Sequence, residues 1–177
     1  MGTIAGATGN APGGLRRGPE GRTDYGGQLK YFEDYATGMI ERFGSYAVTR
    51  EEVVAFARQY DPQPFHLDDA AAAQTYFGRL SASGWHTACM AMRMSVDHWT
   101  GNGMQSLGSP GVDQLRWLTP VYPGDTLRLE TEWLEMRTSR TRTELGIARM
   151  RWTVFNQHDV AVMQLEATQL MRRRPAD

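Results

Sequence analysis

The sequence predicts an α+β fold in which an antiparallel β-sheet wraps around one long central helix. The 177 residues, 41% of them hydrophobic and 22% charged, suffice for one domain with a substantial core. A largely apolar helical stretch ends at the Gly-Asn-Gly sequence of residues 101–103. After it come four long stretches in which apolar and polar residues alternate. A run of strands that follows a run of helices is typical of an α+β domain.

Residues 1–27 differ from the rest of the chain. They hold nine of the 19 glycines and few large apolar side chains. Such a segment buries too little surface to offset the entropy lost when it becomes ordered. We therefore expect a flexible, Gly-rich N-terminal tail at residues 1–27 and a single folded domain at residues 28–177.

The first predicted elements of the domain are an extended segment and a helix. The stretch FGSYAVT, residues 43–49, favours a strand, and the sequence Thr-Arg-Glu-Glu that starts at Thr49 is a capping box. Pro62 ends the helix, because a proline disfavours helical geometry in the residue before it. One face of this helix carries Val53, Phe56, Ala57 and Tyr60.

Two further helices are expected before the strands. Asp68 or Asp69 can cap a short helix over residues 70–77, which Gly78 ends. The long helix begins near Ser83 and Gly84. Its apolar residues point to nearly every side, which is typical of a buried helix. They are Trp85, Ala88, Cys89, Met90, Ala91, Met92, Met94, Val96 and Trp99.

Four strands are expected in the last third of the chain. Their patterns cover residues 112–120, 125–136, 145–156 and 160–171, and polar or Pro-Gly turns separate them. Short turns between consecutive strands favour antiparallel pairing, with one face of the sheet packed on the long helix.

Composition limits the classes of partner. A formal net charge of −1 argues against nucleic acid or an anionic membrane as the main partner, since either would favour a basic excess. The single cysteine, Cys89, is compatible with a reducing compartment, and no apolar run is long enough to span a membrane. We expect a cytoplasmic protein without nucleic-acid or membrane partners.

Asp61 and His66 are the first candidates for chemistry. They lie five residues apart, with two prolines between them, in the turn after the first helix. An arbitrary pair of this kind would be a helix cap and a surface imidazole, but the order of the parts around it is specific. A short helix, a small-residue turn with Gly84 and the long helix follow. Asp68 and Asp69 fit helix caps better than metal ligands, so we predict no metal site.

The motif Asp61-Pro62-Gln63-Pro64-Phe65-His66, followed by the turn Ser81-Ala82-Ser83-Gly84-Trp85-His86, resembles the signature of the MaoC-like dehydratases. This family of (R)-specific enoyl-CoA hydratases has the hot-dog fold. The stretches YFEDYATG and GVDQLRWLTPVYPGDTL are also similar to it. The resemblance covers residues 31–172 and implies a hot-dog domain that forms a homodimer.

The resemblance also implies an activity, the reversible hydration of a trans-2-enoyl-CoA to the (R)-3-hydroxyacyl-CoA. Asp61 and His66 would be the acid and base, in an order that the sequence leaves open. Gly84 would supply an oxyanion N–H at a helix start. The substrate carries coenzyme A, and no other cofactor is implied. The further candidates are Ser83, Trp85 and His86 beside the substrate, and Gln63 and Pro64 as supports of the turn.

The sequence departs from the family pattern at three positions. Gln63 replaces an asparagine, Ser83 replaces a histidine, and Met92 stands where hydratases carry a serine that supports the aspartate. Two other functions therefore stay open, a hot-dog thioesterase and a non-catalytic acyl-CoA-binding or partner subunit. His86 and Cys89 also have the spacing of a thiol with its base, but a small core cysteine is the commoner case.

Overall fold

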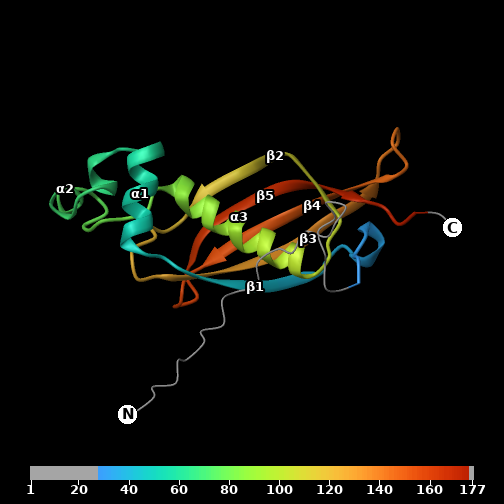
Figure 1. The fold of residues 1–177 in the computed structure, drawn as a ribbon, viewed down its shortest axis with the longest axis horizontal. Helices are drawn as coiled ribbons and strands as arrows, with labels where there is room; N and C mark the ends of the chain where they lie inside the picture. The colour runs from blue at the N-terminus through green and yellow to red at the C-terminus, as the bar shows by residue number, and fades with distance from the viewer. Residues whose placement is uncertain (1–27, 176–177) are drawn as a thin grey trace, which may run out of the picture.

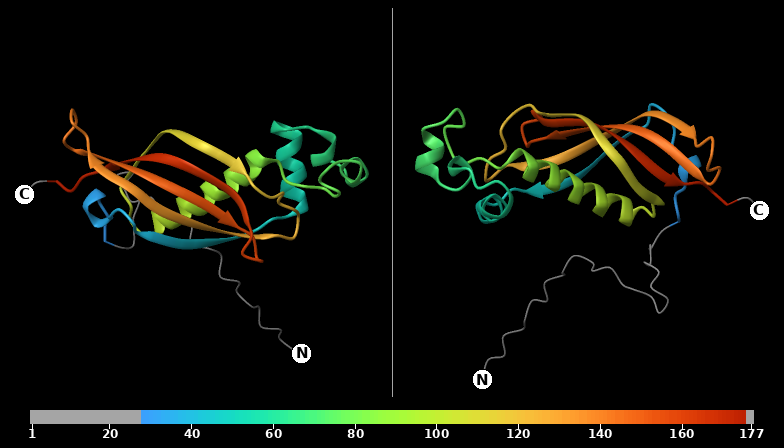
Figure 2. Two further views of the ribbon diagram at one scale, coloured as in Figure 1. Left: turned by 180° about the vertical axis from the view of Figure 1, so that it is seen from behind. Right: turned by 90° about the horizontal axis from the view of Figure 1, so that it is seen from above.

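The computed structural model describes residues 28–175, whose five strands form one antiparallel sheet in the order β1-β3-β4-β5-β2. Helix α3 lies along one face of this sheet, and α1 and α2 gather at one end of it (Figure 1). The view from above in Figure 2 shows the sheet curving around α3. The predicted α+β hot-dog fold is thereby confirmed. The expectation for residues 1–27 falls outside the described residues.

The sheet is built from long hairpins. The strands are β1 Ile40–Ala47, β2 Ser106–Trp117, β3 Thr126–Thr138, β4 Leu145–Phe155 and β5 Ala161–Arg172. Along β3, Leu127, Leu129, Thr131 and Trp133 point into the core, while the alternate residues Arg128, Glu130 and Glu132 face outward. This alternation is what the sequence predicts for a sheet with one buried face.

Strand β2 begins six residues earlier than expected. Its first half, Ser106–Gly111, contains two glycines and Pro110 and pairs with β5 through register shifts. Proline and glycine weaken a central strand but are tolerated at an edge, where one row of backbone groups has no partner strand. The edge position of β2 explains why the alternating pattern begins only at Val112.

The helices before α3 follow the predicted caps. Helix α1 spans Arg50–Tyr60, and the Thr49 hydroxyl accepts the backbone N–H of Glu52 at 3.2 Å. After the 3-10 turn η2 Pro64–His66, Asp68 caps α2, which spans Asp69–Ala73. A second 3-10 turn, η1 Phe32–Asp34, lies before β1.

Helix α2 ends four residues before the expected limit. The Thr75 hydroxyl donates to the Ala72 carbonyl at 2.8 Å and accepts the Phe77 N–H at 3.3 Å. Such local side-chain bonds compete with helical hydrogen bonds and favour turns. The chain from Gln74 to Gly78 is therefore a series of turns.

Helix α3 spans Gly84–Gly101 with Ser83 as its N-cap, so it begins where the sequence predicts, but the expectation that it is a buried helix is wrong. Met90, Ala91 and Met94 pack against the sheet. The opposite side is an exposed apolar stripe, hereafter the α3 stripe, because the sheet covers only one side of the helix in the described chain. The α3 stripe consists of Trp85, Cys89, Met92 and Val96.

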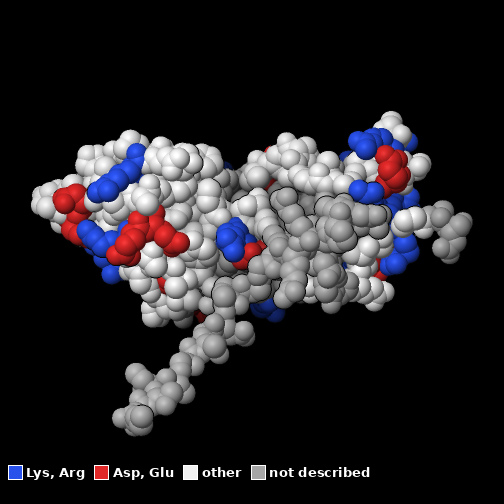
Figure 3. All heavy atoms as spheres, viewed as in Figure 1, with Lys and Arg blue, Asp and Glu red and all other residues white. Residues whose placement is uncertain are grey.

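Many charged side chains of the described residues form ion pairs. Figure 3 shows acidic and basic groups side by side at both ends of the face that it draws. Arg128 pairs with Asp159 at 2.6 Å, and Arg174 pairs with Asp34 at 2.7 Å. Among the helices of residues 28–175, none has the length and apolar character needed to cross a membrane.

Gly44 marks a close approach between β1 and α3. Its φ is +82°, and an added Cβ would lie 2.5 Å from the sulfur and 3.0 Å from the Cβ of the buried Met94. Gly38 shares the positive φ, at +85°, but has open space around it. A side chain at Gly38 would strain only the backbone, whereas a side chain at Gly44 would also overlap Met94.

We predict that Gly44→Ala lowers the free energy of unfolding by about 1–3 kcal/mol more than Gly38→Ala does. Both changes strain a left-handed backbone, but only the first overpacks the contact with Met94. Urea denaturation of the two variants measures the difference. Equal losses would show that α3 can move away from β1 without penalty.

Candidate functional site

A cavity of about 280 Å³ lies where η2, the start of α3 and the segment after β2 meet. Its wall is mainly apolar and aromatic, with one imidazole and the first turn of α3 as polar features. The lining residues are His66, Tyr76, Phe77, Ala82, Gly84, Thr87, Trp117, Leu118, Thr119, Pro120 and Val121. A largely apolar pocket with a few convergent polar groups is the usual form of a small-molecule site.

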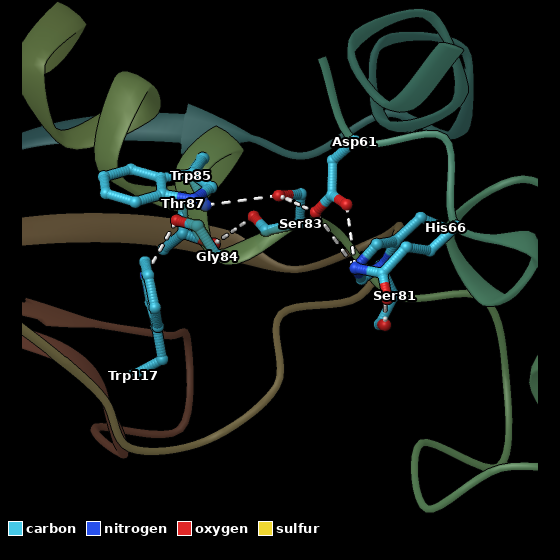
Figure 4. A network of polar contacts seen from close by, with 9 residues as sticks. Asp61, His66, Ser81, Ser83, Gly84, Trp85, Thr87 and Trp117 are labelled. Carbon is cyan, nitrogen blue, oxygen red and sulfur yellow. Dashed lines mark hydrogen bonds and ion pairs between the residues drawn. The ribbon is translucent and has the colours of Figure 1, made fainter.

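Asp61 is the residue at which α1 ends. Pro62 prevents the helix from continuing, and the backbone of Asp61 leaves helical geometry with φ −147° and ψ 66°. Its carboxylate turns toward the start of α3, where Oδ2 accepts the Ser83 hydroxyl at 2.7 Å (Figure 4). The other oxygen, Oδ1, accepts the side-chain amide of Gln63 at 2.8 Å. Each carboxylate oxygen therefore has one donor.

These donors determine the protonation of Asp61. Partial burial alone would raise its pKa, but the hydrogen bonds from Ser83 and Gln63 and the nearby His66 outweigh burial and lower the pKa below its ordinary value. The Asp61 carboxylate is thus held in its ionised form at neutral pH. Because the pKa is lowered, this stabilisation of the fold is present above the unfolded-state pKa and is lost as the pH falls through the folded-state pKa.

His66 is buried, with 4% of its surface exposed, and its ring is oriented by the backbone. Nδ1 lies 2.8 Å from the Ser81 carbonyl oxygen. Because a carbonyl only accepts, Nδ1 carries a proton, and the lone pair of the neutral ring is on Nε2. Nε2 faces Asp61 Oδ2 at 3.6 Å, which is longer than a direct hydrogen bond. The two groups form an acceptor pair with a gap between them.

Gly84 is the first residue of α3 and lines the same cavity. The first N–H groups of a helix have no intrahelical acceptor, and no protein acceptor for the Gly84 N–H is found in residues 28–175. The helix dipole adds positive character at this point. This end of α3 therefore suits an oxygen that carries negative charge.

The ring of Trp117, at the end of β2, packs directly against Gly84. Its indole N–H donates to the Gly84 carbonyl at 2.8 Å, and its ring occupies the space that a Cβ would need. Trp85 packs edge-on against Trp117, with centroids 5.3 Å apart. Residue 84 must consequently be glycine for Trp117 to close the cavity in this way.

The other predicted site residues, Trp85, His86 and Pro64, do not line the cavity. The backbone N–H of Trp85 is bonded to the Ser83 hydroxyl, and its side chain is exposed. His86 points away from the cavity toward α1, where it stacks on Phe56 at 4.7 Å, and burial lowers its pKa. Pro64 occupies the first position of η2 and so shapes the turn that carries His66.

Metal ligation finds no support among residues 28–175, which contain no group of three His, Cys, Asp or Glu side chains arranged around a common point. Asp68 accepts the Ala71 N–H at 2.9 Å as the cap of α2. Asp69 pairs with Arg50. Both aspartates of the turn are thus engaged in local structure.

Sequence reasoning missed several residues of the site. Trp117 and Thr87 reach the cavity only through the packing of β2 and α3, and the sequence pattern around them carries no signal of this. Ser81 acts through its carbonyl, which every residue possesses. Ser83, which we expect beside the substrate, also donates to Asp61. The serine–aspartate contact spans 22 residues, so local spacing does not reveal it.

Comparison with known proteins identifies the family. The model of the MaoC like domain matches residues 36–154, which include Asp61, His66 and Gly84. The chain therefore belongs to the MaoC-like dehydratase family, whose members include hydratases and dehydratases.

Individual relatives agree with this assignment. A MaoC-like dehydratase from Rhodospirillum rubrum is 35% identical, with a TM-score of 0.75 over 83% of this chain and 99% of that chain. The R-hydratase PhaJ1 from Pseudomonas aeruginosa is 27% identical, with a TM-score of 0.64 over 81% and 86% of the two chains. The 3-hydroxybutyryl-CoA dehydratase of Methylorubrum extorquens is 31% identical over 121 residues, 67% of this chain and 73% of the relative.

We predict that Gly84→Ala lowers the free energy of unfolding by about 1–3 kcal/mol, because its Cβ would lie 2.5 Å from the Trp117 ring. In a Trp117→Ala background the same change should cost less than about 1 kcal/mol, since the overlapping ring is gone. A double-mutant cycle by urea denaturation measures this coupling. Additive losses would show that Trp117 does not constrain residue 84.

Proposed function

We propose that the protein catalyses the reversible hydration of a trans-2-enoyl-CoA to the (R)-3-hydroxyacyl-CoA. The observation that carries this proposal is the pair Asp61 Oδ2 and His66 Nε2, which face each other across 3.6 Å beside a cavity lined by Gly84. The (R) configuration is inferred from the R-hydratase PhaJ1 among the similar structures.

The first step needs a water that both groups can hold. Asp61 is ionised, and in the neutral form of His66 the lone pair lies on Nε2, so a water that bridges the two groups would donate one hydrogen bond to each. Its oxygen lone pair is then free to attack C3 of the enoyl group. The proton that the water loses goes to the pair and from there to C2, so one water is consumed and the pair returns to its starting state.

The second requirement is stabilisation of negative charge on the thioester oxygen. As the C3–O bond forms, electrons shift through C2 to this oxygen, giving an enolate-like transition state. In this proposal the Gly84 N–H at the start of α3 would donate to it. The acyl group would occupy the apolar cavity, with coenzyme A outside. The proposed reaction requires neither a metal nor a redox cofactor.

We predict that Asp61→Asn and His66→Ala each lower kcat/KM for hydration of crotonyl-CoA by about 100-fold or more, the size expected for loss of a positioned acid or base. Loss of enoyl-thioester absorbance is the measurement. Asp97→Asn is the matched control, because Asp97 is exposed on α3 and pairs with Arg93. It should retain wild-type activity.

The same experiment separates the alternative functions. Release of free thiol without loss of the enoyl group would identify a thioesterase. Tight binding of acyl-CoA without turnover would identify a non-catalytic subunit. Either result, or variants that match the wild type on crotonyl-CoA and on a longer enoyl-CoA, would contradict the proposed hydration.

We also propose that the protein is a homodimer joined at β2. This strand lies at the edge of the sheet, and an exposed strand edge is a template for pairing. The α3 stripe adds exposed apolar surface, with Met92 at 47% and Val96 at 46% exposure. Contiguous exposed apolar surface of this kind marks interaction sites.

We predict that Met92→Glu combined with Val96→Glu converts the dimer to a monomer, because each protomer would bury two charges at the interface. Sedimentation velocity measures the change in mass. Ile40→Glu is the matched control, since Ile40 is equally exposed, at 47%, but lies on β1 at the opposite edge of the sheet. A monomeric wild type, or loss of the dimer in the Ile40 variant alone, would contradict this interface.

A further inference from the structure

Ser83 joins the two parts of the site that the proposed reaction uses. Its hydroxyl donates to Asp61 Oδ2 at 2.7 Å and accepts the Trp85 N–H at 3.2 Å. The residue that follows it is Gly84. A single side chain therefore connects the carboxylate at the end of α1 with the first turn of α3 (Figure 4).

The orientation of this hydroxyl is fixed by its surroundings. Because Oγ accepts from Trp85, its own proton is directed to the carboxylate, and an ionised carboxylate can only accept it. Ser83 is 1% exposed, so bulk water cannot replace the bond. Hydrogen bonds to a charged acceptor are short and stronger than neutral ones, and the distance of 2.7 Å agrees with this type.

No side chain within α3, Gly84–Gly101, donates a hydrogen bond to the Asp61 carboxylate. Among residues 28–175, the groups that face the carboxylate are Gln63 and His66 from the turn after α1 and Ser83, the N-cap of α3, and His66 is the ionisable side chain among them. Residue 92, the site of the supporting serine in the family pattern, is a methionine in the exposed α3 stripe. It therefore lies on the side of the helix away from the core.

We infer that Ser83 is the positioning residue of the proposed reaction, holding Asp61 ionised and at a fixed place relative to the Gly84 N–H. Ser83 acts through Asp61 and needs no contact with the substrate. The inference rests on the proposed hydratase function. The effect of Ser83 on the pKa of the Asp61 carboxyl can be measured without any enzymatic turnover.

The test compares Ser83→Ala and Ser83→Gly with the wild type. Both remove the hydroxyl, but glycine is the better helix cap, so the two variants differ in helix stability and not in the lost hydrogen bond. Ser95→Ala is the matched control, because Ser95 is a fully buried serine on α3 whose hydroxyl bonds only to the Ala91 carbonyl.

We predict that both Ser83 variants lower kcat/KM by about 10- to 100-fold, the effect of losing a hydrogen bond to a charged group. The pKa of the Asp61 carboxyl, followed by carbon NMR titration, should rise in both variants and stay unchanged in Ser95→Ala. The sign follows from the bond, which favours the ionised form; its loss favours the protonated form.

An Asp61 pKa that is unchanged in both variants would overturn the inference, as would full activity in either of them. Loss of activity only in Ser83→Ala would also overturn it, since that result would indicate a capping role. A wild type without hydratase activity would overturn the proposed function instead. The titration would then still decide whether Ser83 controls the carboxylate.

Discussion

The packing of α3 against one face of the sheet determines where the site can form. Met90, Ala91 and Met94 hold the helix there, and its first turn consequently lies at one end of the sheet, with Ser83 and His86 buried. Backbone N–H groups at a buried helix start must be satisfied or remain available to a ligand. Ser83 satisfies that of Trp85, whereas the Gly84 N–H stays available beside the cavity.

Different contacts set the ionisation of Asp61 and the orientation of the His66 ring. Asp61 receives two side-chain donors, which favour its anionic form over the neutral form that burial would favour. His66 is fixed by a backbone carbonyl, which selects the tautomer with its lone pair toward Asp61. Two different constraints thus give two hydrogen-bond acceptors that face each other across one gap.

Short-range sequence signals predict much of the fold and the positions of the main site residues. The Thr49 cap, the break at Pro62 and the glycine at the start of α3 each act within a few residues, so the sequence places Asp61, His66 and Gly84 correctly on their elements. Contacts between distant segments left no such signal. The hydrogen bond of Ser83, the closure by Trp117 and the exposed α3 stripe depend on how the sheet and α3 pack, which periodicity alone does not encode.

The three departures from the family pattern are mutually consistent in the folded chain. Gln63 is longer than asparagine, yet its amide reaches Asp61 Oδ1 at 2.8 Å. Ser83 supplies a donor to the other oxygen, so a serine at residue 92 is not needed for that purpose. Met92 is then free to serve the exposed face of α3. Each oxygen of the partly buried Asp61 carboxylate thus keeps one donor, and removal of either donor would leave that oxygen without a protein partner among the described residues. The departures therefore leave Asp61 with a different set of supporting groups, Gln63 and Ser83.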